Sequence, residues 1–157
     1  MYKRQAPAKP AAAKPAAAKP AAAKPAAKPV PAQVAAPALV PGTPCTAAAR
    51  ACIDLSAKRA WLIQGGVVQY GPVPITSGRP GYRTPVGNFR VTFKEIDHLS
   101  SLFNNAPMPY SVFFNGGIAF HQGSLSVASH GCIHLSRAAA RTFFASLSPG
   151  NVVQVRP

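Results

Sequence analysis

The side chains best suited to chemistry are concentrated between His121 and Ser136. This stretch holds three of the four histidines of the 157-residue chain and one of its three cysteines. Cys132 is the candidate nucleophile, because a thiolate attacks a carbonyl carbon far better than a hydroxyl does at neutral pH. A free thiol with a pKa of about 8.5 is only slightly ionised at neutral pH, so it needs a partner that takes its proton.

Two histidines are candidates for that base. His130 lies two residues before Cys132, so an extended backbone places both side chains on one face. His121 follows the apolar run 117–120, which predicts a neighbouring strand, where a directly opposed side chain comes within about 5 Å at the β-carbon. We therefore favour His121 as the base and expect His130 to shape the turn. Gly131 permits close approach of the backbone to a substrate, so its amide and that of Cys132 are candidates to stabilise an oxyanion.

A carboxylate partner for the base is missing near this motif. The chain contains only three acidic residues, Asp54, Glu95 and Asp97, and none is close to Cys132 in sequence. We expect a backbone carbonyl to orient His121 instead. A neutral acceptor is compatible with a thiol nucleophile, which needs a weaker base than serine does.

Two segments resemble the L,D-transpeptidase catalytic domain of bacterial cell-wall enzymes. The first is the Ser-His-Gly-Cys run at 129–132, with His-x-Gly at 121–123 upstream. The second is Ser77-Gly78 followed by Arg-Thr-Pro-Val-Gly-Asn-Phe at 83–89. Both segments occur in the order and spacing of that family, and the resemblance extends over roughly residues 50–157.

The resemblance implies a mainly β fold, with a bent sheet or sandwich and one helix after the cysteine, and a transferase of peptidoglycan. Cys132 would attack the L-centre carbonyl of a diamino acid in a tetrapeptide stem and expel D-alanine. The thioester would then pass to a side-chain amine of a neighbouring stem, giving a 3→3 cross-link. The resemblance also implies His121 as base and the amides at 130–132 as oxyanion hole. This chemistry requires no cofactor and no metal. The short loop after His121 predicts a less covered cleft.

Five further residues are expected to contact the substrate. His134 stands where the family usually has Arg or Asn, at a position linked to substrate-carboxylate contact. The other four are Ser129 beside the motif, Tyr110 at the exit of an expected loop, and Arg79 and Arg83, whose charge suits the carboxylates of a stem peptide.

Other interpretations of the same residues stay open. His130, Cys132 and His134 alternate as on one strand face, and together with His121 they are a candidate zinc-ligand set. Cys132 could instead be an inert, buried core residue, since free cysteine is often buried. A thioester released to water would make the protein an L,D-carboxypeptidase. Without catalysis, the domain would be a basic wall-binding module or a nucleic-acid binder.

The first 44 residues differ in composition from the rest. Residues 6–44 are almost wholly Ala, Pro, Lys and Val, and Ala-Ala-Ala-Lys-Pro begins at positions 11, 16 and 21. Proline at this spacing interrupts any helix. We therefore expect a disordered basic spacer at 1–44, followed by a catalytic domain at 45–157.

The balance of charge implies an anionic partner. Lys and Arg number 17 against three acidic residues, which gives a net charge of +14. The family resemblance implies an extracytoplasmic location, in the cell wall or periplasm, which favours anionic wall polymers over nucleic acid. The alternative is that the lysines of the spacer bind nothing and only keep it extended.

The expected location raises the question of export. The sequence contains no stretch of about 18 apolar residues, so no transmembrane helix is expected. The start of the chain, Met1 to Gln5, lacks the apolar region of a signal peptide. In an extracytoplasmic protein with three cysteines, we expect Cys45 and Cys52 to form a disulfide and Cys132 to stay free.

The elements that position the site are predicted to be short strands. Gly65-Gly66 and Asn115-Gly116-Gly117 mark two hairpins. A helix is expected from its N-cap Ser136 to Leu147, and residues 95–110 are expected to form a loop that walls the substrate site. The predicted strands are 52–55, 60–64, 67–70 with an extension at 73–76, 88–94, 110–114, 118–120 and 152–155.

Overall fold

The computed structural model describes residues 36–157, and the first 35 residues lie outside the described part. The disorder and anion binding expected of the spacer therefore stay predictions. Residues 36–44 belong partly to the packed unit. Val40, for example, is buried in one cluster with Cys45, Cys52 and Trp61.

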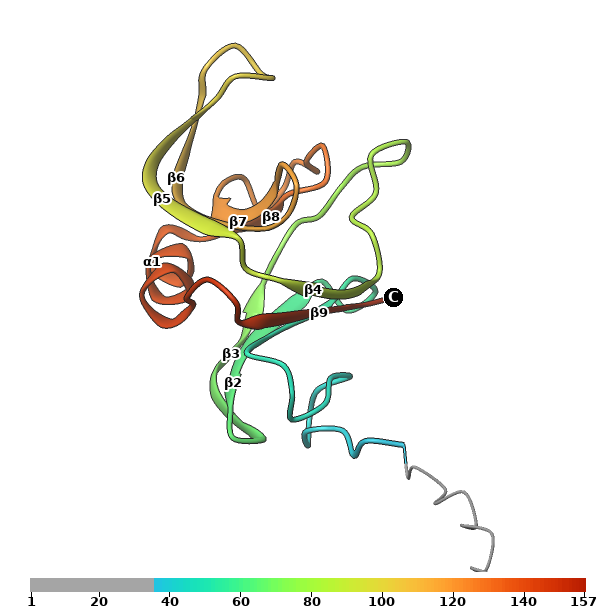
Figure 1. Ribbon diagram of the computed structural model, residues 1–157. Helices are drawn as coiled ribbons and strands as arrows, with labels where there is room; N and C mark the ends of the chain where they lie inside the picture. The colour runs from blue at the N-terminus through green and yellow to red at the C-terminus, as the bar shows by residue number, and fades with distance from the viewer. Residues whose placement is uncertain (1–35) are drawn as a thin grey trace, which may run out of the picture. The chain divides into compact units, whose positions relative to one another are not determined.

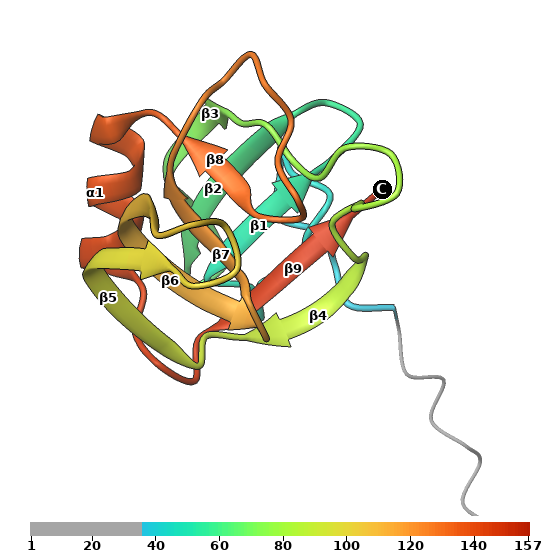
Figure 2. The same cartoon turned by 90° about the horizontal axis from the view of Figure 1, so that it is seen from above.

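Two β-sheets and one α-helix make up residues 36–157, as Figures 1 and 2 show. This confirms the predicted mainly β fold with a helix after Cys132. The first sheet has the strand order β3-β2-β1-β9-β4, and the second has the order β5-β6-β7-β8. The strands of the first sheet are β1 (Ala51–Asp54), β2 (Arg59–Gln64), β3 (Val67–Pro74), β4 (Gly87–Arg90) and β9 (Val152–Arg156). Those of the second are β5 (Phe93–Ser100), β6 (Ala106–Asn115), β7 (Ile118–Gln122) and β8 (Ile133–Leu135).

The predicted glycine hairpins are both present. Gly65 and Gly66 join β2 to β3 with positive φ angles of 58° and 76°, as a tight two-residue turn requires. The predicted strand 88–94 is split in two. Its first part belongs to β4, which ends at Arg90, and its last two residues begin β5 at Phe93. The chain therefore passes from one sheet to the other between these two strands.

The expectation of a loop at residues 95–110 is wrong. Most of this segment forms β5 and the first half of β6, a long bent hairpin that projects from the body of the molecule in Figure 1. Five of the eight residues of β5 are exposed, and its apolar residues Phe93, Ile96 and Leu99 are spaced by three, so no alternating apolar pattern marks it as a strand. Pro107 and Pro109 lie where β6 pairs with β5 alone, and proline is tolerated at such an unpaired edge.

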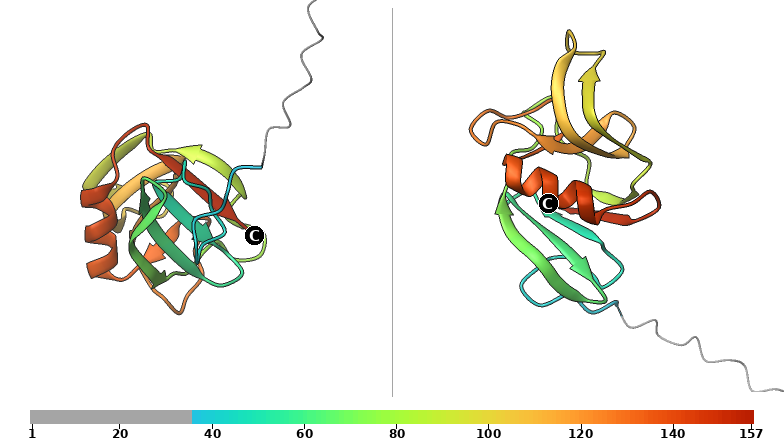
Figure 3. Two further views of the ribbon diagram at one scale, coloured as in Figure 1. Left: turned by 90° about the horizontal axis from the view of Figure 1, so that it is seen from below. Right: turned by 90° about the vertical axis from the view of Figure 1, so that its left-hand side faces the viewer.

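The helix α1 (Arg137–Ser146) closes one side of the space between the two sheets, as Figure 3 shows. Its N-cap is Ser136, as predicted, and the Ser136 side chain accepts the N–H of Ala139. Phe143 on its buried face packs against Tyr70 of β3 and Phe120 of β7, with ring centroids 6.3 and 5.0 Å apart. The helix of the described part is too short and too polar to cross a bilayer.

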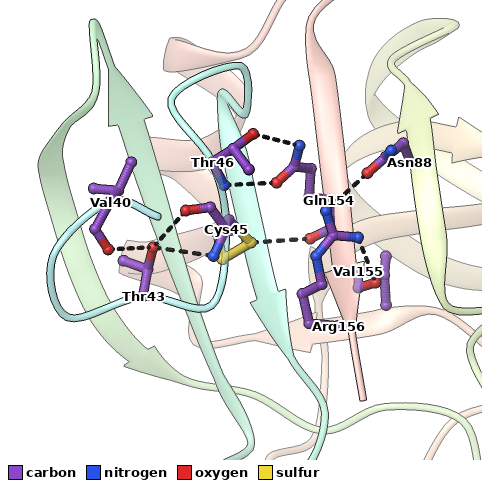
Figure 4. The surroundings of a disulfide bond; sticks show 9 residues. Val40, Thr43, Cys45, Thr46, Asn88, Gln154, Val155 and Arg156 are labelled. Carbon is purple, nitrogen blue, oxygen red and sulfur yellow. Dashed lines mark hydrogen bonds between the residues drawn. A yellow bond between two sulfur atoms is a disulfide. The ribbon is translucent and has the colours of Figure 1, made fainter. Parts of the chain in front are cut away.

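A disulfide joins Cys45 to Cys52 at the entrance to β1. The segment before β1 is also held to β9 through Gln154, drawn in Figure 4. The Gln154 side chain accepts the Thr46 N–H at 2.9 Å and donates to Thr46 Oγ1 at 2.9 Å. These contacts fix the outer face of the first sheet, far in sequence from the candidate nucleophile.

Candidate active site

A cavity of about 880 Å³ is lined by residues of the second sheet and of the loops beside it. It is lined by the unpaired Cys132 and by every histidine of the chain: His98, His121, His130 and His134. Residues from four segments therefore converge here, namely the β5–β6 hairpin, β7, the loop before β8, and β8 itself.

His121 and Cys132 lie on the same face of the sheet but not opposite each other. Strands β7 and β8 run parallel, and the partner of His121 is His134, with ring centroids 4.8 Å apart. Cys132 comes two residues before His134, so the His121 ring is its diagonal neighbour. The base and the nucleophile were expected to be directly opposed across the two strands, but Cys132 lies two residues before the residue that is opposite His121.

The hydrogen bond of His121 fixes its tautomer. Nδ1 lies 2.7 Å from the carbonyl oxygen of Gln122. A carbonyl only accepts, so Nδ1 carries the proton and donates it, which leaves Nε2 as the proton acceptor. A backbone carbonyl thus holds the second ring nitrogen, in the manner expected from the scarcity of carboxylates.

Burial keeps both reactive groups uncharged. It lowers the pKa of His121 to about 4, with smaller contributions from the charges of His134 and His98, against the effect of the Gln122 carbonyl. Burial also raises the pKa of the Cys132 thiol, against a smaller opposing effect of the Ala119 amide. At neutral pH the site therefore holds a neutral thiol beside a neutral imidazole, and the thiol proton must move as the sulfur attacks.

The loop before β8 presents fewer free amides than expected. The Gly131 N–H donates to Ser129 Oγ at 3.0 Å, so it is not available to an oxyanion. The N–H groups of His130 and Cys132 have no hydrogen-bond partner within residues 36–157. Gly131 itself has a φ of +123°, and a β-carbon there would lie 3.3 Å from the Ile118 side chain. Glycine is required at this position for both reasons.

Thr84 holds this loop in place, a role that the sequence analysis missed. Its side chain is buried, donates to the Gly131 carbonyl at 2.7 Å and accepts the Gly78 N–H at 3.1 Å. Gly78 in turn approaches the chain so closely that an added β-carbon would lie 1.8 Å from the Tyr82 carbonyl oxygen. The Gly-x₅-Thr-Pro segment was the sequence signal for this role, since its threonine hydrogen-bonds both its own glycine and the Cys132 loop.

Ser129 and His134 line the cavity, and internal hydrogen bonds hold both. Ser129 Oγ donates to the Cys132 carbonyl at 2.6 Å, which closes the turn around Gly131. His134 Nδ1 lies 3.0 Å from the Ser124 carbonyl oxygen. Its ring covers Gly123, where a β-carbon would come within 2.6 Å of the imidazole.

The remaining predicted residues occupy three different places. The His130 ring is exposed and lies between Tyr82 and Phe103, at centroid distances of 4.9 and 4.4 Å. Arg79 and Arg83 line a neighbouring depression of about 620 Å³, not the cavity of the thiol. The structure does not bring Tyr110 to the cavity, because its ring packs against Phe144 and the Arg137 guanidinium on the side of α1.

The placement of these side chains also bears on metal binding and on the partner of His98. Across the described range 36–157, no three side chains of His, Cys, Asp or Glu are placed to hold a metal ion, so the zinc alternative lacks a ligand set. His98 does not pair with its sequence neighbour Asp97; its Nδ1 contacts the Glu95 carboxylate.

Comparison with known proteins places this site in a family. A model of the L,D-transpeptidase catalytic domain (YkuD) matches residues 48–155. A search of curated proteins found no match. The fold is similar to three solved L,D-transpeptidases, from Stackebrandtia nassauensis, Mycobacterium tuberculosis and Xylanimonas cellulosilytica.

The likeness covers most of this chain but only part of each relative. The S. nassauensis structure is 28% identical with a TM-score of 0.65, and the match covers 68% of this chain and 54% of that one. The M. tuberculosis structure is 27% identical with a TM-score of 0.64, and the match covers 68% of this chain and 57% of that one. The X. cellulosilytica structure is 27% identical with a TM-score of 0.64, and the match covers 73% of this chain and 63% of that one. This chain thus spans less than two thirds of these relatives' length. With the family model matching most of the sequence, the chain belongs to the L,D-transpeptidase catalytic domain family.

Proposed function

We propose that this protein is a cysteine-dependent L,D-transpeptidase that forms 3→3 cross-links between peptidoglycan stems through a thioester on Cys132. The observation that carries the proposal is that a free thiol and the proton-accepting Nε2 of His121 belong to side chains that line one cavity. Members of this family act on stem peptides of the wall, so the proposed location is extracytoplasmic.

Acylation begins with a proton transfer that the neutral pair permits. As Sγ attacks the carbonyl carbon of the donor stem, Nε2 of His121 takes the thiol proton. The negative charge that develops on the carbonyl oxygen is stabilised by the free N–H of Cys132, with the N–H of His130 as a second donor. The imidazolium then returns its proton to the leaving D-alanine amine, and the thioester remains on Sγ.

Loop rigidity supports this assignment of the oxyanion site. The Gly131 carbonyl is held by Thr84, and the Cys132 carbonyl by Ser129. Both peptide planes that flank the Cys132 α-carbon are therefore fixed before substrate arrives. A donor that needs no reorganisation stabilises the transition state more than one that must first turn.

The stem beyond the reacting residue has a cationic surface within reach. The depression that holds Arg79 and Arg83 shares Ala128 with the wall of the catalytic cavity. The guanidinium of Arg79 is stacked on the Tyr82 ring at 4.8 Å, which holds it in position. Carboxylates of a stem peptide would bind in this depression.

The test is product analysis with defined muropeptides. Purified protein is incubated with a disaccharide-tetrapeptide, and the products are identified by mass spectrometry. The proposal predicts a cross-linked dimer that has lost one D-alanine, absent with Cys132→Ala. Tripeptide without dimer would show that the thioester is released to water, as in an L,D-carboxypeptidase, and no turnover at all would contradict the proposal.

A further inference from the structure

The wall of the catalytic cavity formed by the β5–β6 hairpin carries an imidazole, His98, that the acylation step does not use. His98 lines the cavity and its Nδ1 contacts the Glu95 carboxylate, while Glu95 itself does not line the cavity. A carboxylate on one ring nitrogen fixes the orientation of the imidazole ring. The pair therefore has the build of an oriented base whose other nitrogen, Nε2, is left for a ligand.

His98 and Cys132 both contact one small cluster of side chains. The His98 ring stands edge-on to Phe113 at a centroid distance of 4.8 Å, and His98 is the register partner of Met108. Cys132 packs against the same small cluster, which contains Met108 and Phe113. The charge of His98 also reaches His121, whose pKa it helps to lower behind the larger effect of burial.

The use of a carboxylate here is notable in a chain with only three acidic residues. Asp54 closes a turn by accepting the Ser56 hydroxyl and the Ala57 N–H, each at 2.8 Å. Asp97 has no side-chain hydrogen bond or ion pair within residues 36–157. Glu95 is the carboxylate coupled to a cavity-lining group.

The second half of the proposed reaction needs a proton acceptor of its own. A side-chain amine reaches the site mainly as an ammonium ion, since such amines have a pKa near 10.4. It cannot attack the thioester until one proton is removed. His121 lies beside the sulfur, where it must handle the proton that the departing thiolate recovers.

We infer that His98, oriented by Glu95, is the base that deprotonates the acceptor amine in the transfer step; this rests on the proposed function. One ammonium proton passes to His98 Nε2, and the amine nitrogen forms a bond to the thioester carbonyl carbon. The carbon–sulfur bond breaks, and the second proton lost by nitrogen passes through His121 to Sγ. The products are an amide, a free Cys132 thiol and a protonated His98, which returns its proton to solvent. Glu95 is a positioning residue.

The experiment separates the two half-reactions. His98→Gln and Glu95→Gln are compared with the wild type and with the control Asp97→Asn, which alters an acid on the same strand that contacts no cavity group. Acyl-enzyme formation from a donor stem is followed by intact-protein mass. Transfer is then started with an alkylamine acceptor or with hydroxylamine, which is largely unprotonated at neutral pH.

For His98→Gln we expect retained acylation and a loss of transfer to the alkylamine of roughly 10²-fold, with Glu95→Gln intermediate. Transfer to hydroxylamine stays near the wild-type rate, because no proton has to be removed from this nucleophile before it attacks. The control Asp97→Asn behaves as the wild type with both nucleophiles. Unchanged alkylamine transfer in His98→Gln would overturn the inference while leaving the proposed function standing. Equal loss with both nucleophiles would also overturn it, since it would indicate a distorted hairpin. Absence of an acyl-enzyme in the wild type would instead contradict the proposed function itself, and this assignment with it.

Discussion

At the scale of single residues, the reactive pair differs from a preformed thiolate–imidazolium pair. Burial disfavours both charged forms, so the neutral state is the resting state. The proton is then transferred during attack, which makes the rate depend on the fraction of His121 that is unprotonated.

The pH profile of acylation follows from the lowered pKa of His121. A pKa of about 4 in the folded protein means that the ring is a competent base throughout the neutral range. The rate of acylation by a carbapenem, followed by intact-protein mass, should therefore stay level from neutral pH downward and fall only as the pH approaches about 4. A descending limb centred on the ordinary histidine pKa of about 6.5 would contradict the burial of this ring.

Thr84 offers a second residue-scale prediction. Replacing Thr84 by Val keeps the shape but leaves the Gly131 carbonyl and the Gly78 N–H without their partner. Each unmade buried hydrogen bond costs about 1–3 kcal/mol, so both the free energy of unfolding and the acylation rate should fall.

Thr84→Ser is the matched control, because it keeps the hydroxyl. Urea unfolding and carbapenem acylation are measured on both variants. If Val and Ser behave alike, the hydroxyl is not what fixes the Cys132 loop.

At the scale of elements, the loop that holds Cys132 depends on a tight fold of the segment 78–84 upon itself. Gly78→Ala should lower the thermal unfolding midpoint strongly, because its β-carbon would overlap the Tyr82 carbonyl oxygen, which is backbone and cannot turn away. Gly117→Ala is the control, since a β-carbon there meets nothing within 4 Å. Differential scanning calorimetry measures the unfolding midpoints of both variants, and equal midpoints would contradict the close approach of Gly78 to the Tyr82 carbonyl.

Sequence patterns predicted those elements whose burial is one-sided or whose ends carry strong local signals. The Gly65-Gly66 turn and the Ser136 cap are of this kind, because each is set by chemistry within a few residues. Residues 95–109 of the β5–β6 hairpin were missed, because the apolar residues of β5 fall at 93, 96 and 99, out of step with a strand, and the first half of β6 contains prolines. Their strand character comes from the pairing of β5 with β6, which the residue pattern of neither segment indicates by itself.

The candidate site was predicted less evenly than the fold. Residue chemistry was enough to select Cys132 and His121, and the scarcity of acids was enough to expect a backbone carbonyl as the partner of His121. The diagonal placement of the pair required the parallel register of β7 and β8, and the loss of the Gly131 amide required the Ser129 turn. Both depend on which segments meet in space.

At the scale of the whole molecule, the two ends of the described part are fastened far from the chemistry. The Cys45–Cys52 bridge and the Thr46–Gln154 contacts hold the first sheet, whereas the thiol of Cys132 belongs to the second. Stability and reactivity should therefore respond to different cysteines.

Replacing both Cys45 and Cys52 by Ser should lower the free energy of unfolding by about 2 kcal/mol, because the loop that the bridge closes is short. Carbapenem acylation at a temperature where the variant stays folded should be unchanged. Urea unfolding with and without reductant measures the first effect, and loss of acylation in the folded variant would show that the two sheets are coupled.

The account as a whole depends on Cys132 forming a thioester with His121 as its base. The most direct measurement is the intact mass of the protein after incubation with a carbapenem, for the wild type, Cys132→Ala and His121→Gln. We predict one added carbapenem on the wild type, none on Cys132→Ala, and formation slowed by roughly 10²-fold or more in His121→Gln. An unmodified wild type, or an adduct that survives in Cys132→Ala, would contradict the account.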